Sequence, residues 1–262
     1  MVSPEDEPPA AATSSVAWLE ARWPLAHRIR VVTTLRQGGT STGVYQGFNL
    51  ATHVGDDPKA VADNRRQLQA LLGDLPVQWL EQVHGTEIVA ARPGEVPEAD
   101  GAWTDQPGVV LAILTADCLP VILADAEGQA LAAVHGGWRG LVGGVLEAAV
   151  QSLPTAPTHA WLGPAIGPEH YEVGPEVLSA VRELGFADAG LIRMGDQSGD
   201  QSGKGTLDLF TLAERKLRAL GVTSIHGERW STWDTTRFYS YRREGQTGRM
   251  ATLAWLSPER RR

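Results

Sequence analysis

Residues 109–140 read VVLAILTADCLPVILADAEGQALAAVHGGWRG, and this stretch decides the fold. It contains three short apolar runs, at 109–114, 119–123 and 130–134. Runs of this length that are bounded by turn residues are typical of buried strands. The residues TADC follow the first run, and HGGWRG follows the third. The stretch therefore predicts neighbouring strands whose ends carry side chains suited to chemistry.

Outside this stretch, strands and helices follow one another irregularly. Further strands are predicted over 78–83 and 87–91, on either side of a turn at His84, and over 250–256. The predicted helices cover residues 58–72, 141–153, 175–184 and 209–220. Because no strict strand–helix–strand rhythm is present, we expect an α/β fold of the mixed α+β kind, with mixed β-sheets and flanking helices.

Length and composition predict one globular domain. The chain has 262 residues, of which 42% are hydrophobic, and this suffices for one large core. Residues 1–15 are acidic and rich in Pro, Ala and Ser, so we expect a disordered lead-in that is not a secretory signal. The single catalytic domain is then expected over 16–262. No apolar run reaches the ~18 residues that a membrane helix needs, so we expect no membrane partner.

Charge and cysteine content narrow the function classes. The formal net charge of -8 argues against a nucleic-acid partner, because proteins that follow a phosphate backbone usually present a basic face. Cys118 is the only cysteine, which excludes an intrachain disulfide and any structural zinc site built from several cysteines. This usage is typical of a reducing compartment, so we expect a cytoplasmic protein. A monomer and a small homo-oligomer both remain open.

His84, Cys118 and His135 are the candidate catalytic and metal-binding residues. Each lies at the end of a predicted strand beside small residues. Two imidazoles and a thiolate are zinc ligands, and three protein ligands leave the fourth position of a zinc ion open for catalysis. Their spacing matches no local metal motif, so an inert core thiol and a histidine in a turn are the competing interpretation.

Two arginines are candidate anion contacts. Arg65 lies on the apolar stripe of the predicted helix 58–72, where a buried cation is costly unless it is paired. It either extends its charged end to solvent at the edge of the stripe or contacts a buried anionic ligand. Arg139 follows a Gly-Gly turn that leads into a helix, an arrangement that favours anion binding. The C-terminal arginines form a second basic cluster, for which a solvated surface is the simpler interpretation.

Several segments identify a family when they are taken together. In chain order they include RQGGTSTGVYQGFNLATHVGDD, NRRQL, EQVHGTEI, TADC, AVHGGWRGLVGG, WLGPAIGPEHYEVGPEV and FYSYRREGQTGRMA. These segments resemble the YfiH family, also called the laccase-domain or polyphenol oxidase family. The resemblance extends from about residue 30 to residue 256, and the motifs QVHG, TADC and VHGGWRG are specific in combination and order.

The resemblance implies a zinc-dependent purine nucleoside phosphorylase with adenosine deaminase activity. It implies zinc ligands at His84, Cys118 and His135, and substrate or phosphate contacts around Asn49 and Arg65. The implied partners are phosphate and purine nucleosides, namely adenosine, inosine, guanosine and methylthioadenosine. The usual zinc deaminase signature, H-x-E with P-C-x-x-C, is absent, so deamination would need another arrangement. Asp117, beside Cys118, is a candidate proton shuttle or a residue that supports the ligands.

Three alternatives stay open at this point. A copper polyphenol oxidase would need a trinuclear copper cluster, which demands more histidines than the 7 in the chain. A cysteine hydrolase would use Cys118 as nucleophile with His84 or His135 as base, and amide hydrolysis of peptidoglycan precursors fits this chemistry. A metal- or nucleoside-binding module without catalysis is the third.

Overall fold

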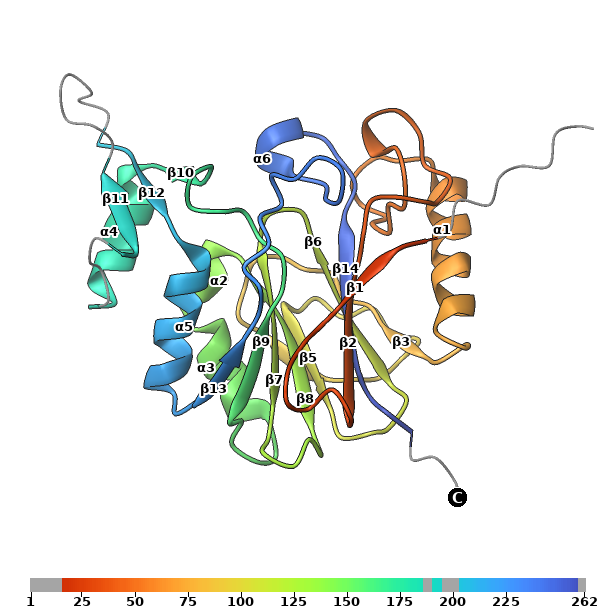
Figure 1. The fold of residues 1–262 in the computed structure, drawn as a ribbon, viewed down its shortest axis with the longest axis horizontal. Coiled ribbons are helices and arrows are strands. Elements are labelled where there is room, and N and C mark those ends of the chain that lie inside the picture. The colour runs from red at the N-terminus through yellow and green to blue at the C-terminus, as the bar shows by residue number, and fades with distance from the viewer. Residues whose placement is uncertain (1–15, 186–189, 195–202, 259–262) are drawn as a thin grey trace, which may run out of the picture.

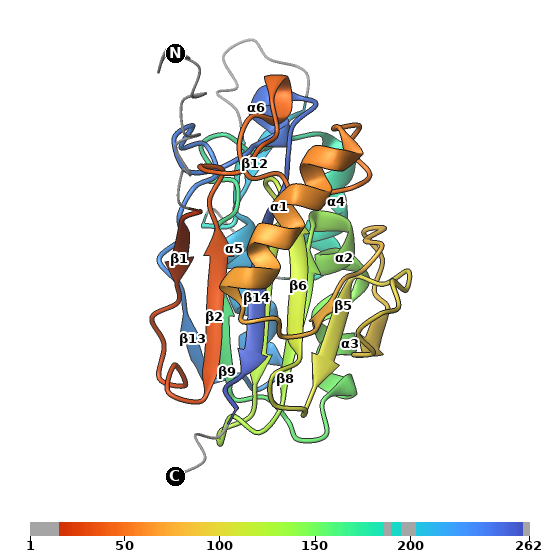
Figure 2. The same ribbon diagram turned by 90° about the vertical axis from the view of Figure 1, so that its right-hand side faces the viewer.

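A computed structural model describes residues 16–185, 190–194 and 203–258. The lead-in expected over 1–15 lies outside the described residues. Two mixed sheets form the centre of the molecule, and helices lie on the outside of both (Figures 1 and 2). This agrees with the mixed α/β fold that the sequence predicts.

The first sheet has five strands, in the spatial order β1-β2-β14-β6-β3. Its strands are β1 (Trp18–Glu20), β2 (Ile29–Thr34), β14 (Met250–Leu256), β6 (Val110–Thr115) and β3 (Val77–Gln78). The carboxyl-terminal strand β14 pairs antiparallel with both β2 and β6. An early strand, β2, and the last strand, β14, are therefore neighbours in one sheet.

The second sheet has six strands, in the order β13-β9-β7-β8-β5-β4. Its strands are β13 (Ser224–His226), β9 (His159–Leu162), β7 (Leu119–Ala124), β8 (Leu131–Gly136), β5 (Gly101–Thr104) and β4 (Ile88–Ala90). A small third sheet contains β10 (Glu172–Val173), β12 (Gly205–Leu207) and β11 (Ile192–Met194). The turn between β6 and β7 carries the chain from the first sheet to the second.

The two large sheets pack face to face. Side chains alternate between the faces of a strand, so Leu111 and Ile113 of β6 point into the layer between the sheets. There they meet Ile122 of β7 and Ala133 of β8. Val110 of β6 belongs instead to the core on the outer face. Because β6 is buried on both faces, its sequence is continuously apolar.

Helices cover the outer face of each sheet. Helix α1 (Pro58–Leu71) packs on the outer face of the five-stranded sheet (Figure 2). It does so through Leu68 and through Leu72, the residue that follows the helix. On the six-stranded sheet lie α2 (Trp138–Gly143) and α3 (Val145–Ser152), and α5 (Leu209–Ala219) packs against both. Helix α4 (Pro175–Glu183) lies farther out, beside α2 and the small third sheet (Figure 1). The remaining helical segments are short, a 3-10 turn at Gly43–Tyr45 and α6 (Tyr241–Glu244). In the part of the chain described, no helix is long and apolar enough to cross a bilayer.

Two predicted elements differ from the structure. The single helix expected over 141–153 is two helices, because Gly144 adopts φ +104° and ends α2 before α3 begins. The strand expected over 78–83 stops at Gln78. Beyond it, the side chain of Gln82 accepts a hydrogen bond from the amide of Leu114 and donates one to its carbonyl, at 2.8 and 2.9 Å. Hydrogen bonds from the Gln82 side chain thus replace backbone pairing between strands at this position.

Candidate metal centre

The three predicted metal ligands meet at one end of the two central sheets. Cys118 lies in the turn that joins β6 to β7, and His135 is the penultimate residue of β8. His84 comes from the loop between β3 and β4. His135 pairs with Pro120 in the β7–β8 register, which brings the strand end beside the Cys118 turn. The fold therefore brings together three residues that are far apart in sequence.

The distances suit one metal ion. The ligand atoms of His84, Cys118 and His135 all lie within 4.8 Å of one another. Sγ of Cys118 is 3.8 Å from Nε2 of His84, and the two imidazole rings are edge-on at 4.7 Å between centroids. Around a tetrahedral zinc ion, with nitrogens at about 2.1 Å and sulfur at about 2.3 Å, neighbouring donors lie roughly 3.5 Å apart. Small side-chain rotations would let the cluster bind a metal. Because His84 is exposed, one side of the cluster faces solvent.

Asp100, which sequence reasoning missed, orients His135. Asp100 is fully buried, and its Oδ1 lies 2.7 Å from Nδ1 of His135. A carboxylate in this position holds the proton on Nδ1 and leaves Nε2 free to bind a metal. Asp100 directly precedes β5, which pairs with β8, so the register of these strands sets the contact.

The same carboxylate also holds the turn that carries His84. Asp100 accepts hydrogen bonds from the backbone amides of Val83, His84 and Gly85. His84 has φ +63°, a conformation that side-chain-bearing residues rarely adopt and that costs about 1–2 kcal/mol. Three amide hydrogen bonds to one buried carboxylate offset that cost. Asp100 therefore connects both histidines of the cluster.

Cys118 and His135 form a charge pair. Burial alone raises the pKa of Cys118, but the positive charge of His135 and hydrogen bonds from both histidines lower it to about 6. Burial alone lowers the pKa of His135, and the charges of Cys118 and Asp100 raise it to about 9. A thiolate beside an imidazolium is thus favoured in the metal-free site. Thiolate is the form of cysteine that binds metal ions and acts as a nucleophile.

Gly137 has a packing role, and the anion-binding role predicted for the Gly-Gly turn stays a prediction. A Cβ atom at Gly137 would lie 2.9 Å from Cδ2 of His84 and 3.2 Å from Sγ of Cys118. Only a glycine lets the chain pass this close to both ligands. The helix that follows, α2, has 6 residues, and the carbonyl of Gly137 accepts its first hydrogen bond, from Leu141.

Asp117 braces the turn of Cys118. It is buried and has φ +95°. Its Oδ1 accepts a 2.6 Å hydrogen bond from the hydroxyl of Thr232, and its Oδ2 accepts one of 2.6 Å from the amide of Arg242. Both carboxylate oxygens therefore help to position the turn, and the proton-shuttle role of Asp117 stays a prediction.

The tentative substrate residues lie in different environments. Asn49 is fully buried, and both atoms of its side-chain amide are hydrogen-bonded within the chain. Arg65 is half-buried, with its guanidinium carbon 4.0 Å from the ring centroid of Trp79. Arg139 is exposed and lies 4.6 Å from the ring centroid of Trp138. Substrate contact by these three residues stays a prediction.

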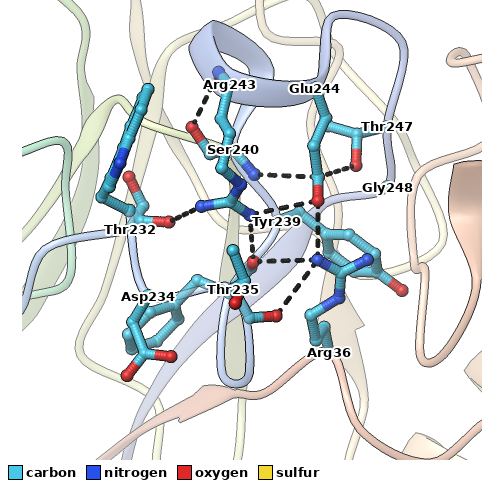
Figure 3. Close-up of polar contacts among 12 residues, drawn as sticks. Arg36, Thr232, Asp234, Thr235, Tyr239, Ser240, Arg243, Glu244, Thr247 and Gly248 are labelled. Carbon is cyan, nitrogen blue, oxygen red and sulfur yellow. Dashed lines mark hydrogen bonds and ion pairs between the residues drawn. The ribbon is translucent and has the colours of Figure 1, made fainter. Parts of the chain in front are cut away.

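The C-terminal arginines have different partners. Arg243 and Arg36 both pair with Glu244 of α6, at 3.1 and 2.8 Å, and Figure 3 shows these contacts around the short helix. Arg237 pairs with Asp234. Arg249 is half-buried, and burial lowers its pKa while the charges of Cys118 and Asp117 act in the opposite direction. From the sequence alone, the arginines that pair with carboxylates in loops could not be distinguished from Arg249, which lies near Cys118.

These features define a class of protein: a two-sheet α/β domain with a His–Cys–His cluster that can bind a metal between its strand ends. A family model described as "Multi-copper polyphenol oxidoreductase laccase" matches residues 30–257. The chain belongs to this family, as the sequence motifs predict.

Curated relatives match over nearly their full length. A protein named purine nucleoside phosphorylase PA4543, from Pseudomonas aeruginosa, is 46% identical over 243 residues, which is 92% of this chain and 98% of the relative. Purine nucleoside phosphorylase YfiH of Escherichia coli is 41% identical, covering 90% of this chain and 97% of the relative.

Solved structures share the fold. The protein NMB0706 of Neisseria meningitidis superposes with a TM-score of 0.85 at 42% identity, covering 92% of this chain and 99% of the other. YlmD of Geobacillus stearothermophilus gives a TM-score of 0.83 at 30% identity, covering 95% and 98%.

Proposed function

We propose that this chain is a zinc-dependent purine nucleoside phosphorylase with an additional adenosine deaminase activity. The observation that carries the proposal is the convergence of His84, Cys118 and His135, whose ligand atoms lie within 4.8 Å of one another. Full-length relatives named purine nucleoside phosphorylases support it. The proposed substrates are adenosine, inosine, guanosine and methylthioadenosine, each with phosphate.

Zinc fits the donor set better than a copper cluster does. Two histidines and one cysteine, with one exposed side, match the ligand number of a catalytic zinc site. A multicopper oxidase would need a second group of histidines for its trinuclear centre. Within the described residues, the only group of three or more His, Cys, Asp or Glu side chains that converge in this way is the one already named. We therefore propose one zinc ion for each chain.

Phosphorolysis requires positioning more than covalent chemistry from the protein. A phosphate oxygen bonds to C1′ of the ribose while the C1′–N9 bond breaks, and its electron pair goes to the purine, which takes up a proton. Zinc, when bound, would supply Lewis acidity to an oxygen of phosphate or of the nucleoside. Arg65 and Arg139 are the proposed phosphate contacts, since bidentate arginine contacts hold an oxyanion in a fixed orientation. Asn49 is the third proposed substrate or phosphate contact.

Product analysis of adenosine tests this function. The zinc-loaded protein should convert adenosine with phosphate to adenine and ribose 1-phosphate, and a smaller fraction to inosine. Adenine release should depend on phosphate, whereas inosine release should not. The chelator-treated protein is the control for both reactions. If the zinc-loaded protein consumes none of the four nucleosides, the proposed function is wrong.

A cysteine amide hydrolase is the second candidate, and the Cys118 pair supports it. The thiol has a pKa of about 6 and lies 3.8 Å from Nε2 of His84, which suits a nucleophile beside a base. Peptidoglycan precursors are the proposed amide substrates in that case. This activity should survive removal of the metal and should be lost on alkylation of Cys118. Phosphorolysis should instead be lost when the metal is removed.

A further inference from the structure

A polar cavity of about 780 Å³ opens beside the glycine-rich segment 36–47, which follows β2. This segment supplies most of the lining, and Thr235 and Thr236 complete it. Among the described residues that line the cavity, Arg36 is the only charged one, and none has an aromatic or an acidic side chain. Small-molecule sites have volumes of about 300–1,000 Å³, so the cavity has room for a small polar ligand.

Buried polar side chains hold this segment in place on the side of α1. The side chain of Asn64, which is fully buried, accepts a 2.8 Å hydrogen bond from the amide of Thr40. It also donates to the hydroxyl of Ser41 and to the carbonyl of Gly47, at 3.0 and 3.3 Å. The hydroxyl of Ser41 in turn donates to Asp56, at 2.6 Å. The shape of the cavity wall is therefore set without a ligand.

Several hydrogen-bond donors on this wall have no acceptor in the described part of the protein. The amides of Gly38 and Gly39 are two of them. Both glycines line the cavity and have positive φ, at +84° and +71°, which glycine adopts without penalty. Thr42 also lines the cavity, and its hydroxyl neither caps the 3-10 turn that follows nor contacts another described residue. The wall thus offers two amides and a hydroxyl to a ligand that accepts hydrogen bonds.

Arg36 adds a positive charge to these donors. Its Nη1 contacts Glu244 at 2.8 Å and donates to the carbonyls of Thr235 and Phe238, at 3.3 and 3.4 Å (Figure 3). Its Nε and Nη2 have no acceptor among the described residues. Glu244 also pairs with Arg243, so two cations share one carboxylate and one positive charge is left over. The surroundings of Arg36 therefore favour an anion.

The cavity and the metal cluster lie at different strand ends. Segment 36–47 follows β2, whereas Cys118 follows β6, and β14 lies between these two strands in the sheet. Neighbouring strands are about 4.8 Å apart, so roughly 10 Å separate the two strand ends. None of the described residues that line the cavity is a candidate metal ligand or one of the proposed substrate contacts Asn49, Arg65 and Arg139. The cavity is therefore separate from the proposed substrate site.

We propose that this cavity binds a phosphorylated sugar, at a site that goes beyond the proposed function and does not depend on it. The phosphoryl oxygens accept from the amides of Gly38 and Gly39 and from the hydroxyl of Thr42, because successive backbone amides suit an oxyanion. The free nitrogens of Arg36 provide charged donors to the same group. The polar walls suit the hydroxyls of a sugar. A nucleobase would find no aromatic ring to stack on in the described lining.

Glucose 6-phosphate, added to the zinc-loaded protein, tests the site. In protein labelled with ¹⁵N-glycine, it should shift the amide signals of Gly38 and Gly39, and glucose should not. Inorganic phosphate should shift the same signals only at higher concentration, because it lacks the sugar. No shift with glucose 6-phosphate, or an equal shift with glucose, would overturn the site. Equal affinity for inorganic phosphate would overturn the assignment to a sugar phosphate.

A charge placed in the cavity tests its position. Thr42→Glu should weaken the binding of glucose 6-phosphate about tenfold or more, because a carboxylate repels the phosphoryl group and the Thr42 side chain supports no other described residue. Val44→Glu is the matched control, since Val44 is exposed in the same segment and does not line the cavity. It should keep the affinity within about twofold, because solvent screens a charge outside the cavity. Equal losses in both variants would overturn the position.

Kinetics separate this site from the substrate phosphate. Thr42→Glu should leave KM for phosphate in the cleavage of inosine unchanged. A KM that rises as the binding of glucose 6-phosphate weakens would make the cavity part of the substrate site and overturn the inference. If the protein binds glucose 6-phosphate at Gly38 and Gly39 but cleaves no nucleoside, the cavity site stands and the proposed function is wrong.

Discussion

At the scale of single residues, Asp100 shows how one buried carboxylate organises a site from several parts of the chain. It contacts the ring of His135 and the backbone amides of the His84 turn. Its position before β5 gives no sequence signal, because Asp-Gly after a polar stretch is common in turns. The ligands themselves were predictable from their chemistry and motifs. Asp100 was not, since its contact depends on how β5 and β8 align.

Cys118→Ser should remove the metal. A serine hydroxyl is usually protonated and is a poor zinc ligand, so we expect less than about one tenth of the wild-type zinc content. Elemental analysis measures the zinc, and both phosphorolysis and deamination should disappear with it. A serine variant that keeps its zinc but loses amide hydrolysis would favour the nucleophile role of Cys118 instead.

Asp100→Asn should weaken zinc binding while the fold persists. Loss of a carboxylate that orients a ligand typically costs 10- to 100-fold in metal affinity, and we expect roughly that here. Competition with a chromogenic chelator measures the affinity. Asp125→Asn is the matched control, because Asp125 is also buried and accepts several backbone amides, at a turn without metal ligands. Equal zinc affinity for both variants would contradict the role of Asp100.

At the scale of elements, the turn that leads into α2 needs a glycine at position 137 because it passes close to two metal ligands. Gly137→Ala places a methyl group against His84 and Cys118, so we expect about tenfold weaker zinc binding with little loss of stability. Gly143→Ala, at the other end of α2, is the control, since its added Cβ would meet only a methyl group of Thr86, at 3.2 Å. Zinc affinity that is unchanged in Gly137→Ala would show that the ligands can move aside freely.

Glu244 of helix α6 should make the free energy of unfolding fall as the pH becomes acidic. Burial alone would raise the pKa of Glu244, but hydrogen bonds from Thr247, Arg36 and Arg243 lower it to about 2 (Figure 3). Because the pKa is lower in the folded state, this contribution is present above the unfolded value of 4.5 and is lost as the pH falls from there toward 2.

Glu244→Gln tests this anchor. Because solvent screens this exposed carboxylate, we expect about 1 kcal/mol lower free energy of unfolding at neutral pH, and a difference from wild type that shrinks between pH 5 and pH 2. Urea unfolding at several pH values measures both. A difference that stays constant over this range would assign the effect to packing rather than to charge.

At the scale of the whole molecule, most of the fold followed from local patterns. Asp57 and Pro58 correctly indicated where α1 begins, and the strand predicted over 250–256 matches β14. The apolar runs after Gly108 correctly indicated β6, β7 and β8. The order of strands in the sheets could not be predicted, because it depends on contacts between distant segments such as β14 and β6.

Removal of zinc should lower the melting temperature without unfolding the protein. The four buried apolar clusters include none of the three ligands, so the metal-free chain keeps its core. Free zinc at 100 times its dissociation constant adds about 2.7 kcal/mol. For a chain of this length that corresponds to roughly 5–10 °C. Calorimetry with and without chelator measures the shift, and a chelated protein without a cooperative transition would contradict the expectation.

The left-handed backbone at His84 and Asp117 has a consequence for evolution and engineering. Glycine adopts these conformations without the penalty that a side chain brings, so His84→Gly and Asp117→Gly relieve backbone strain while removing a ligand and the brace of another. In the metal-free protein, stability and metal binding thus favour opposite residues at His84. A mutant library screened for thermal tolerance in the presence of a chelator would enrich glycine there and lose a metal ligand, whereas zinc in the screen would favour histidine because the bound metal stabilises the fold.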